Sequence, residues 1–212
     1  PQNWDISRHH FGRMAKMEKY LVGTSSGAIV GIIGSDRTAV ADPKGSKAGK
    51  DDHGLYMTWE FEPGFAFNKP SDVVRMLDAV DDSNFGVLYD TSHGHMCSVV
   101  GSRHPGEKET LAGGQVEFIR MLKDRINHIH LIDSDNTCHK DENGEDETSM
   151  HLPFGQGVLD FDALIPELAK VELNHDWWTI DLCFWPDAWE ATEICKKFMD
   201  QMNDRYFAAS AS

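Results

Sequence analysis

The sequence of 212 residues predicts one α/β domain built around a largely parallel sheet. Apolar, strand-like runs alternate along the chain with segments in which apolar residues recur every three or four positions, as they do on one face of a helix. Several of the strand-like runs are apolar almost throughout, which is typical of strands covered on both faces. Strands that alternate with helices predict parallel pairing with helical crossovers.

The elements are expected to follow one another in a regular order. They are a helix over residues 5–21, a buried strand over 28–33, a long loop over 35–54, a strand over 55–62, a helix over 69–80, a strand over 86–90, a polar loop, a helix over 116–122, a strand over 126–133, an acidic loop over 134–150, a helix from 160, a strand over 177–185 and a closing helix over 186–202. Turn-forming Gly, Pro, Asp and Asn residues stand at most of the boundaries. We expect a single domain over 1–212, in which the strand over 28–33 joins the parallel sheet.

Composition restricts the class of protein. The chain carries a formal net charge of −15, and this negative field disfavours binding to nucleic acid. No apolar run approaches the ~20 residues that a membrane span needs. Four widely spaced cysteines argue against a disulfide framework and against a structural zinc site: Cys97, Cys138, Cys183 and Cys195. We therefore expect a soluble, cytoplasmic protein with reduced thiols.

Potential metal ligands recur near the ends of four predicted strands. Glu60, Asp90, His130 and Asp181 each lie in the later half of a strand. In a parallel barrel the carboxyl ends of the strands open on one face, so these side chains are expected to meet. Three carboxylates and one imidazole suit Mn²⁺ or Mg²⁺, and less specifically Co²⁺ or Zn²⁺. The alternative is that each is a structural polar group, with Asp90 capping a turn and His93 on the surface.

At these residues the chain resembles the sugar phosphate isomerase/epimerase superfamily, the xylose-isomerase-like TIM barrels. The resemblance extends from about Leu55 to the final helix. It rests on Trp-Glu-Phe-Glu-Pro at 59–63, Val-Leu-Tyr-Asp-Thr-Ser-His at 87–93, His-Ile-His-Leu-Ile-Asp at 128–133 and His-Leu-Pro-Phe-Gly-Gln-Gly-Val-Leu-Asp-Phe at 151–161. It implies a TIM-barrel-like (β/α) parallel barrel. Because that fold needs eight strands and five are predicted here, we expect a barrel that lacks its N-terminal βα units, as a fragment of a longer polypeptide or as an open barrel completed by another chain.

The resemblance also implies a ligand set for one divalent cation, namely Glu60, Asp90, His130 and Asp181. Glu62 is the rival to Glu60, because both lie on the same face of their strand. Glu60 is favoured, which leaves Glu62 as a substrate contact. The family usually has Glu where this chain has Asp181, whose carboxylate sits further back, so Asp181 is expected to keep the ligand role and to lose the role of proton-transfer base.

Further residues are assigned around this set by the same resemblance. His93 would hydrogen-bond substrate hydroxyls. His151 would reach the substrate from its loop, or else pack within that loop. His128 and Asp133 would orient the ligand imidazole. Trp185 is one of several tryptophans with a face that suits sugar stacking, together with Trp59, Trp177 and Trp178, although most of these are expected in the core.

These assignments lead to the hypothesis of a divalent-metal-dependent sugar isomerase or epimerase. It would abstract a proton next to a carbonyl through a metal-stabilised enediolate. Glu60 is the expected base because its side chain is longer, with Asp181 opposite and His93 on the substrate. Reprotonation on the other face gives epimerisation, and reprotonation at the next carbon gives isomerisation.

Two alternatives keep the same barrel. One is a lyase that uses the metal site to eliminate the aglycone from an oxidised glycoside, and the other is a catalytically inactive, truncated barrel acting as a subunit or binding module. A phosphodiester-cleaving enzyme would need more metal ligands and a basic groove, which the acidic charge disfavours. The expected partners are a small-molecule sugar or sugar derivative and, because an open barrel exposes strand edges, a second copy or a partner subunit; no nucleic acid or membrane partner is expected.

Overall fold

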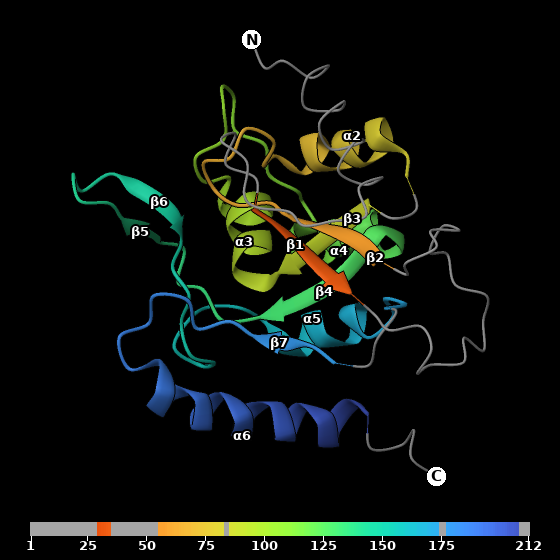
Figure 1. Cartoon of the computed structure of the whole chain (residues 1–212). Helices are drawn as coiled ribbons and strands as arrows, with labels where there is room; N and C mark the ends of the chain where they lie inside the picture. The colour runs from red at the N-terminus through yellow and green to blue at the C-terminus, as the bar shows by residue number, and fades with distance from the viewer. Residues whose placement is uncertain (1–28, 35–54, 83–84, 174–176, 208–212) are drawn as a thin grey trace.

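The computed structural model describes residues 29–34, 55–82, 85–173 and 177–207. The predicted helix over 5–21 and the predicted loop over 35–54 lie outside these ranges. Between residues 55 and 180 at least one helix separates successive strands of the main sheet, and Figure 1 shows these strands lying between helices. None of the described helices is both long and apolar enough to cross a membrane.

A five-stranded sheet forms the centre of the fold, in the order β1-β2-β3-β4-β7. Its strands are β1 (Ile29–Gly34), β2 (Leu55–Glu60), β3 (Phe85–Asp90), β4 (Ile126–Leu131) and β7 (Thr179–Ile180). From β2 to β7 each neighbouring pair is parallel. The prediction of an α/β fold with a parallel sheet is confirmed for these four strands, whose carboxyl ends therefore lie at one edge.

The first strand departs from the prediction. β1 pairs with β2 in the antiparallel direction, with Ile29 opposite Glu60, so the expectation of a parallel strand at 28–33 is wrong. An apolar, β-branched run indicates burial but not direction. About 20 residues separate β1 from β2, a length that suits either a crossover or a simple return.

One longer helix lies between each pair of neighbouring parallel strands, and these helices occur where the spacing of apolar residues predicts them. They are α2 (Pro70–Val80) after β2, α4 (Gly114–Leu122) after β3 and α5 (Phe161–Leu168) after β4. Pro70 occupies the first turn of α2, where its missing N–H has no partner to lose. The inward face of α2 is apolar and consists of Val73, Met76 and Leu77.

Aromatic side chains hold β2 and β3 against α4. The rings of Phe61 and Phe118 lie 5.2 Å apart, and Tyr89 meets each of them edge-on at 6.0 Å. All three are fully buried, and each such pair contributes about 0.5–1.5 kcal/mol beyond the burial of its area. Trp59 stacks on Phe85 at 6.3 Å and belongs to the same core, not to a sugar-stacking surface. This packing fixes the strand ends on which the candidate ligands stand.

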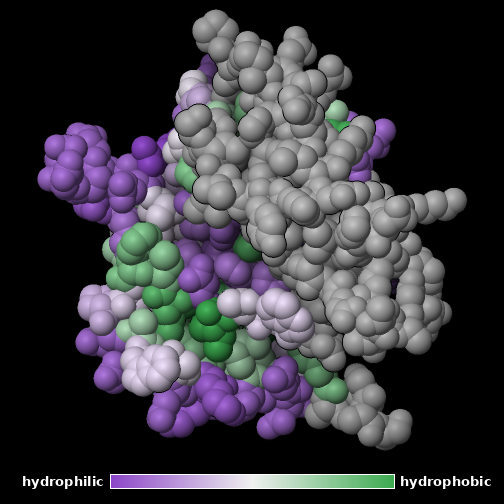
Figure 2. Space-filling model, in the orientation of Figure 1, coloured by the Kyte–Doolittle hydropathy of each residue, from purple (hydrophilic) through white to green (hydrophobic). Residues whose placement is uncertain are grey.

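The segment predicted as an acidic loop over 134–150 contains a β-hairpin. Its strands β5 (Cys138–Lys140) and β6 (Asp146–Ser149) pair antiparallel, and they project from the body of the molecule as a hydrophilic lobe (Figures 1 and 2). Asp141 stabilises the turn, because its carboxylate accepts two backbone N–H groups of the turn at 2.8 Å. The prediction of a plain loop is wrong because polar residues on both faces of the hairpin leave no alternating apolar pattern.

The last strand is shorter than the strand predicted over 177–185. β7 ends at Ile180, and the chain then turns. Asp181 Oδ1 accepts a hydrogen bond from the Cys183 N–H at 3.0 Å, and Phe184 adopts a positive φ of 61°. A bond from a side chain to nearby backbone competes with the sheet for these groups, which explains why the apolar run does not continue as a strand.

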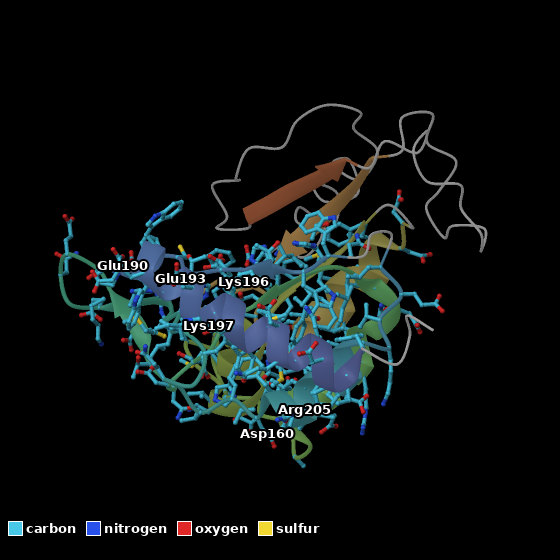
Figure 3. All side chains as sticks on the ribbon, turned by 90° about the horizontal axis from the view of Figure 1, so that it is seen from below. Asp160, Glu190, Glu193, Lys196, Lys197 and Arg205 are labelled. Carbon is cyan, nitrogen blue, oxygen red and sulfur yellow. The ribbon has the colours of Figure 1, made fainter. Side chains whose placement is uncertain are left out.

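The predicted closing helix is present as α6 (Ala188–Tyr206), which runs along the outside of α5 and β7 (Figure 1). Phe198 on its inner side stacks on Phe154 at 4.3 Å. Charged side chains line its outer side (Figure 3), where the labelled residues of the helix are Glu190, Glu193, Lys196, Lys197 and Arg205. The helix therefore covers the core with one face and meets solvent with the other.

Candidate metal centre

Asp90 ends β3 and begins the next helix at the same time. The helix α3 (Thr91–His95) follows directly, and Asp90 Oδ1 accepts hydrogen bonds from the N–H groups of Ser92 at 2.7 Å and His93 at 2.9 Å. Asp90 therefore caps α3, as the structural alternative predicted. The other oxygen, Oδ2, is buried without a hydrogen-bond partner among the described residues. One oxygen holds the helix, and the other is left for a further partner.

Four side chains converge at the carboxyl edge of the parallel strands. Glu60 ends β2, Asp90 ends β3, His130 lies in β4 and Asp181 follows β7. One potential ligand atom from each lies within 4.8 Å of those of the other three. His130 Nδ1 is 3.2 Å from Asp181 Oδ2 and 3.7 Å from Glu60 Oε1. The structure thus brings together the four residues predicted as ligands, and their role as ligands stays a prediction.

Glu62, the rival to Glu60, lies just beyond the end of β2. Both side chains are buried, but the convergent group contains Glu60 and not Glu62. Because β2 ends at Glu60, the two residues do not continue the alternating pattern that would put them on one strand face. The geometry therefore favours Glu60 as the ligand, with Glu62 close enough to raise the pKa of Glu60.

Two buried histidines flank this group. His93 Nε2, from α3, is 3.7 Å from Glu60 Oε1. His151, from the segment after β6, places Nε2 3.7 Å from Asp90 Oδ1 and Nδ1 3.7 Å from Asp181 Oδ2. The two imidazole rings lie 5.0 Å apart, and Asp90, His93 and His151 form a second group of potential ligands. Both histidines predicted to contact substrate thus face the carboxylates.

The surroundings shift the pKa values of the three carboxyl groups in different directions. Burial raises the pKa of Glu60 well above its ordinary value, and the neighbouring carboxylates, Asp90 foremost, raise it further. Burial also raises the pKa of Asp90, although the charges of His151 and His130 oppose the shift. For Asp181 burial acts in the same direction, but its hydrogen bond to His130 and the nearby His151 outweigh burial and lower the pKa. Glu60 therefore tends to hold a proton that Asp181 gives up.

This donor set fits a divalent cation. Carboxylate oxygens with one imidazole nitrogen are donors that Mn²⁺ and Mg²⁺ accept. The raised pKa of Glu60 and the unpartnered Oδ2 of Asp90 both indicate a site in which positive charge is missing, and a bound cation is the largest local charge that can supply it. The donors do not distinguish one of these metals from the other.

The two residues predicted to orient the ligand imidazole behave differently. His128 packs edge-on against His130, with 5.3 Å between ring centroids, and its Nε2 is 2.8 Å from Thr179 Oγ1. The prediction for Asp133 is wrong, because its carboxylate holds the loop that follows His151. It accepts four backbone N–H groups, from Ser134, Gly155, Gly157 and Leu159. Four backbone donors saturate this carboxylate, so it has no oxygen free for an imidazole.

The remaining tryptophans lie around β7. Trp177 packs on His128 with ring centroids 4.6 Å apart. Trp185 lies in the turn after Asp181 and donates its backbone N–H to the Leu182 carbonyl at 3.1 Å. Its half-buried ring stands near the end of the strand that delivers Asp181, and its role as a substrate contact stays a prediction.

Sequence reasoning missed Ser149, the last residue of β6. Its hydroxyl is 2.5 Å from His93 Nδ1, and both side chains are buried. Burial lowers the pKa of His93 well below its ordinary value, with neighbouring histidines adding to the shift, and this favours the neutral ring. A single Ser at the end of an acidic segment carries no signal of such a contact, because the two residues are 56 positions apart.

A comparison with family models agrees with this fold. Residues 50–199 match the family described as xylose isomerase-like TIM barrel. No curated protein matches the sequence. Among solved structures, the crystal structure of the probable 3-DHS dehydratase AsbF involved in petrobactin synthesis, from Bacillus anthracis, is similar with a TM-score of 0.48 and 15% identity, over 70% of this chain and 50% of that chain. The chain thus spans about half the length of that protein. Because the family match covers more than half of the 212 residues, the chain belongs to the xylose isomerase-like TIM barrel family.

Proposed function

We propose that the protein is a divalent-metal-dependent sugar isomerase or epimerase that removes a proton next to a carbonyl group. The convergence of Glu60, Asp90, His130 and Asp181 at one edge of the sheet is the observation that carries this proposal. Mn²⁺ or Mg²⁺ is the proposed cation, and a small sugar or sugar derivative is the proposed substrate. Four free cysteines suit a cytoplasmic setting.

The side chains around the centre supply the proton chemistry. A bound divalent cation would polarise the substrate carbonyl and offset the negative charge that develops beside it. Glu60 is the proposed base that takes and returns the proton, because it ends β2 at the centre and has the longest carboxylate side chain of the group. Asp181, with its lowered pKa, stays ionised and adds negative charge to the ligand set. His93 and His151 lie where they can hydrogen-bond substrate oxygens.

A second candidate function is a lyase that eliminates the aglycone from an oxidised glycoside. The difference between Glu60 and Asp181 favours it. In the metal-free protein the environments of Glu60 and Asp181 push their pKa values apart, and Glu60 has the longer side chain, so Glu60 is proposed as the single proton-transfer group. Epimerisation by two bases needs a proton-transfer group on each face of the substrate. Elimination and isomerisation need only one.

Solvent deuterium exchange into a panel of ketosugars tests the proposal. The protein is loaded with Mn²⁺, and deuterium in the recovered sugar is measured by mass spectrometry. Exchange is expected in the wild type and is expected to fall by about 10²–10⁴-fold in Glu60→Gln, the range for loss of a positioned base. Glu62→Gln is the matched variant, two residues away and equally buried, and a smaller loss is expected there.

Product analysis separates the two candidates, because only a lyase releases an aglycone from an oxidised glycoside. Absence of both exchange and aglycone from the metal-loaded protein would reject the enzymatic proposal. If, in addition, calorimetry detects no Mn²⁺ binding, the inactive barrel acting as a subunit or binding module is the remaining explanation.

A further inference from the structure

The contact between Ser149 and His93 joins the projecting hairpin to the candidate metal centre. Ser149 ends β6, and His93 lies in α3. The Ser149 hydroxyl oxygen is 2.5 Å from His93 Nδ1, and the exposed fractions of the two residues are 0% and 3%. The opposite ring nitrogen, Nε2, faces Glu60 Oε1 at 3.7 Å. One side of the ring is thus held by the hairpin, and the other is directed at the carboxylates.

The direction of this hydrogen bond follows from the number of protons that the imidazole and the hydroxyl can donate. A neutral imidazole has one N–H and one bare nitrogen, whereas a serine hydroxyl has one proton to donate. If Nδ1 carried the proton, the buried Ser149 hydroxyl would have no acceptor for its own proton among the described residues. If Ser149 donates to a bare Nδ1, both groups are satisfied. The ring proton then stands on Nε2, where it faces the carboxylate of Glu60.

We propose that Ser149 is a positioning residue that holds His93 in the tautomer with its proton on Nε2, so that His93 is a hydrogen-bond donor and not a metal ligand. This proposal deepens the proposed function and rests on it for the identity of the acceptor, a carbonyl or hydroxyl oxygen of the substrate. It also assigns a purpose to the hairpin. The hairpin delivers the hydroxyl that decides which ring nitrogen carries the proton.

A consequence concerns the second group of potential ligands. A metal ligand must offer a lone pair, but Nδ1 accepts the Ser149 proton and Nε2 carries one. Without His93, that group retains only Asp90 and His151, which is fewer than the three or more protein ligands of a typical transition-metal site. Among the described residues, one site for a divalent cation is therefore expected, at Glu60, Asp90, His130 and Asp181.

Nuclear magnetic resonance tests the tautomer directly. Long-range ¹H–¹⁵N spectra of the ¹⁵N-histidine-labelled chain show which ring nitrogen is protonated, and the His93 signals are those lost in His93→Gln. The wild type and Ser149→Thr, which keeps the hydroxyl, are expected to show the proton on Nε2. Ser149→Ala is expected to show a mixture of the two tautomers. A proton on Nδ1 in the wild type, or an unchanged spectrum in Ser149→Ala, overturns the proposal.

The matched control is Ser92→Ala. The Ser92 hydroxyl donates to the Met150 carbonyl at 3.0 Å, so it joins the same helix to the end of the same hairpin without touching the His93 ring. This variant is expected to keep the proton on Nε2. A change of tautomer in Ser92→Ala equal to that in Ser149→Ala would show that only the attachment of the hairpin matters, and would contradict a specific role of the hydroxyl. If Ser149→Ala does not fold, the tautomer of the wild type and of Ser149→Thr still decides.

Titration with Mg²⁺ and the exchange assay complete the test. The Nε2 proton is expected to persist at excess Mg²⁺, with one equivalent bound in calorimetry, and a second equivalent that removes this proton would overturn the proposal. Deuterium exchange is expected to fall by about 10-fold in Ser149→Ala, the lower end of the effect of groups that orient a functional side chain, and to recover in Ser149→Thr. If the wild type shows no exchange, the proposed function fails, while the spectra still decide the role of Ser149.

Discussion

At the scale of single residues, Asp90 joins the fold to the site. Its Oδ1 caps α3, and its Oδ2 is buried among the candidate ligands without a partner from the described residues. A carboxylate that only capped a helix would lie at the surface, where both oxygens meet water. Complete burial of a charged Asp90 beside Glu60 and Asp181 is costly unless the carboxylate takes up a proton or a further group balances its charge.

Asp90→Asn separates the two tasks of this residue. Asn caps helices about as well as Asp, so far-UV circular dichroism is expected to stay unchanged. The loss of the negative charge is expected to weaken Mn²⁺ binding by more than about 100-fold, beyond the 10–100-fold typical of groups that only support a ligand, as measured by calorimetry. Asp160→Asn, at the cap of α5, is the control and should bind Mn²⁺ like the wild type. Equal losses in both variants would contradict the assignment.

The raised pKa of Glu60 predicts that metal binding releases protons. In the metal-free protein Glu60 keeps its proton above the ordinary range of a glutamate, and a cation must displace it. Affinity for Mn²⁺ is therefore expected to rise with pH until the raised pKa of Glu60 is passed. Calorimetry in buffers of different ionisation enthalpy should detect protons released on binding, and Glu60→Gln should release fewer.

The raised pKa of Glu60 also predicts how the free energy of unfolding changes with pH. Because the pKa of Glu60 is higher in the folded than in the unfolded chain, the folded state binds more protons between the two values. The contribution of Glu60 to the free energy of unfolding of the metal-free protein is therefore complete below the unfolded pKa and is lost as pH rises through the folded pKa. Glu60→Gln should flatten this pH dependence in urea denaturation, and an identical dependence in both proteins would contradict the assignment.

At the scale of elements, the side chain of Asp133, just after β4, holds the segment that follows His151. Asp133 accepts four backbone N–H groups, three of them from the loop over 155–159. Gly157 is required there, because a Cβ at this position would run into the Asp133 carboxylate. The loop in turn leads into α5. Asp133 therefore stabilises the loop geometry that presents His151, instead of acting on the metal ligand.

Asp133→Ala is expected to lower the free energy of unfolding by about 3–5 kcal/mol, because several backbone donors lose their only acceptor at once. Urea denaturation followed by tryptophan fluorescence measures the change. Asp162→Ala is the control. Asp162 is exposed and bonds Arg205 and Tyr206 on the surface between α5 and α6, so its loss should change stability little. A small effect of Asp133→Ala would show that the loop is held by other contacts.

At the scale of the whole molecule, the site exists only through the order of the strands. The four candidate ligands come from or directly follow β2, β3, β4 and β7, which are neighbours in that order. Each parallel step brings one more carboxyl end to the same edge. A cation bound there would join four strands that are otherwise linked by their ladders and by the aromatic core. Metal binding and global stability should therefore be coupled.

Mn²⁺ is accordingly expected to raise the melting temperature. At a free metal concentration of 100 times the dissociation constant, linkage predicts about 2.7 kcal/mol of stabilisation, which corresponds to about 5–10 °C for a chain of this size. Differential scanning calorimetry with and without a chelator measures the shift. Asp90→Asn should show no shift at the same Mn²⁺ concentration. A shift of equal size in that variant would place the stabilising cation elsewhere.

Local patterns of the sequence were sufficient for much of this structure. The spacing of apolar residues predicts α2, α4, α5 and α6, and the continuous apolar runs predict β2, β3 and β4, because helical and strand periods depend on which face of an element is buried. The same patterns place Glu60, Asp90, His130 and Asp181 at or near strand ends. Together with the family resemblance, they were enough to name the four residues that converge.

Only the tertiary structure decided what depends on partners distant in sequence. Four features depend on contacts between segments that no local period relates. They are the antiparallel direction of β1, the pairing of β5 with β6, the four donors on Asp133 and the contact of Ser149 with His93. Periodicity determines which side of an element is buried, but it carries no information on strand direction or on which hydroxyl meets which imidazole. Those features are fixed when the chain packs, because each buried polar group must then find a hydrogen-bond partner in the space available.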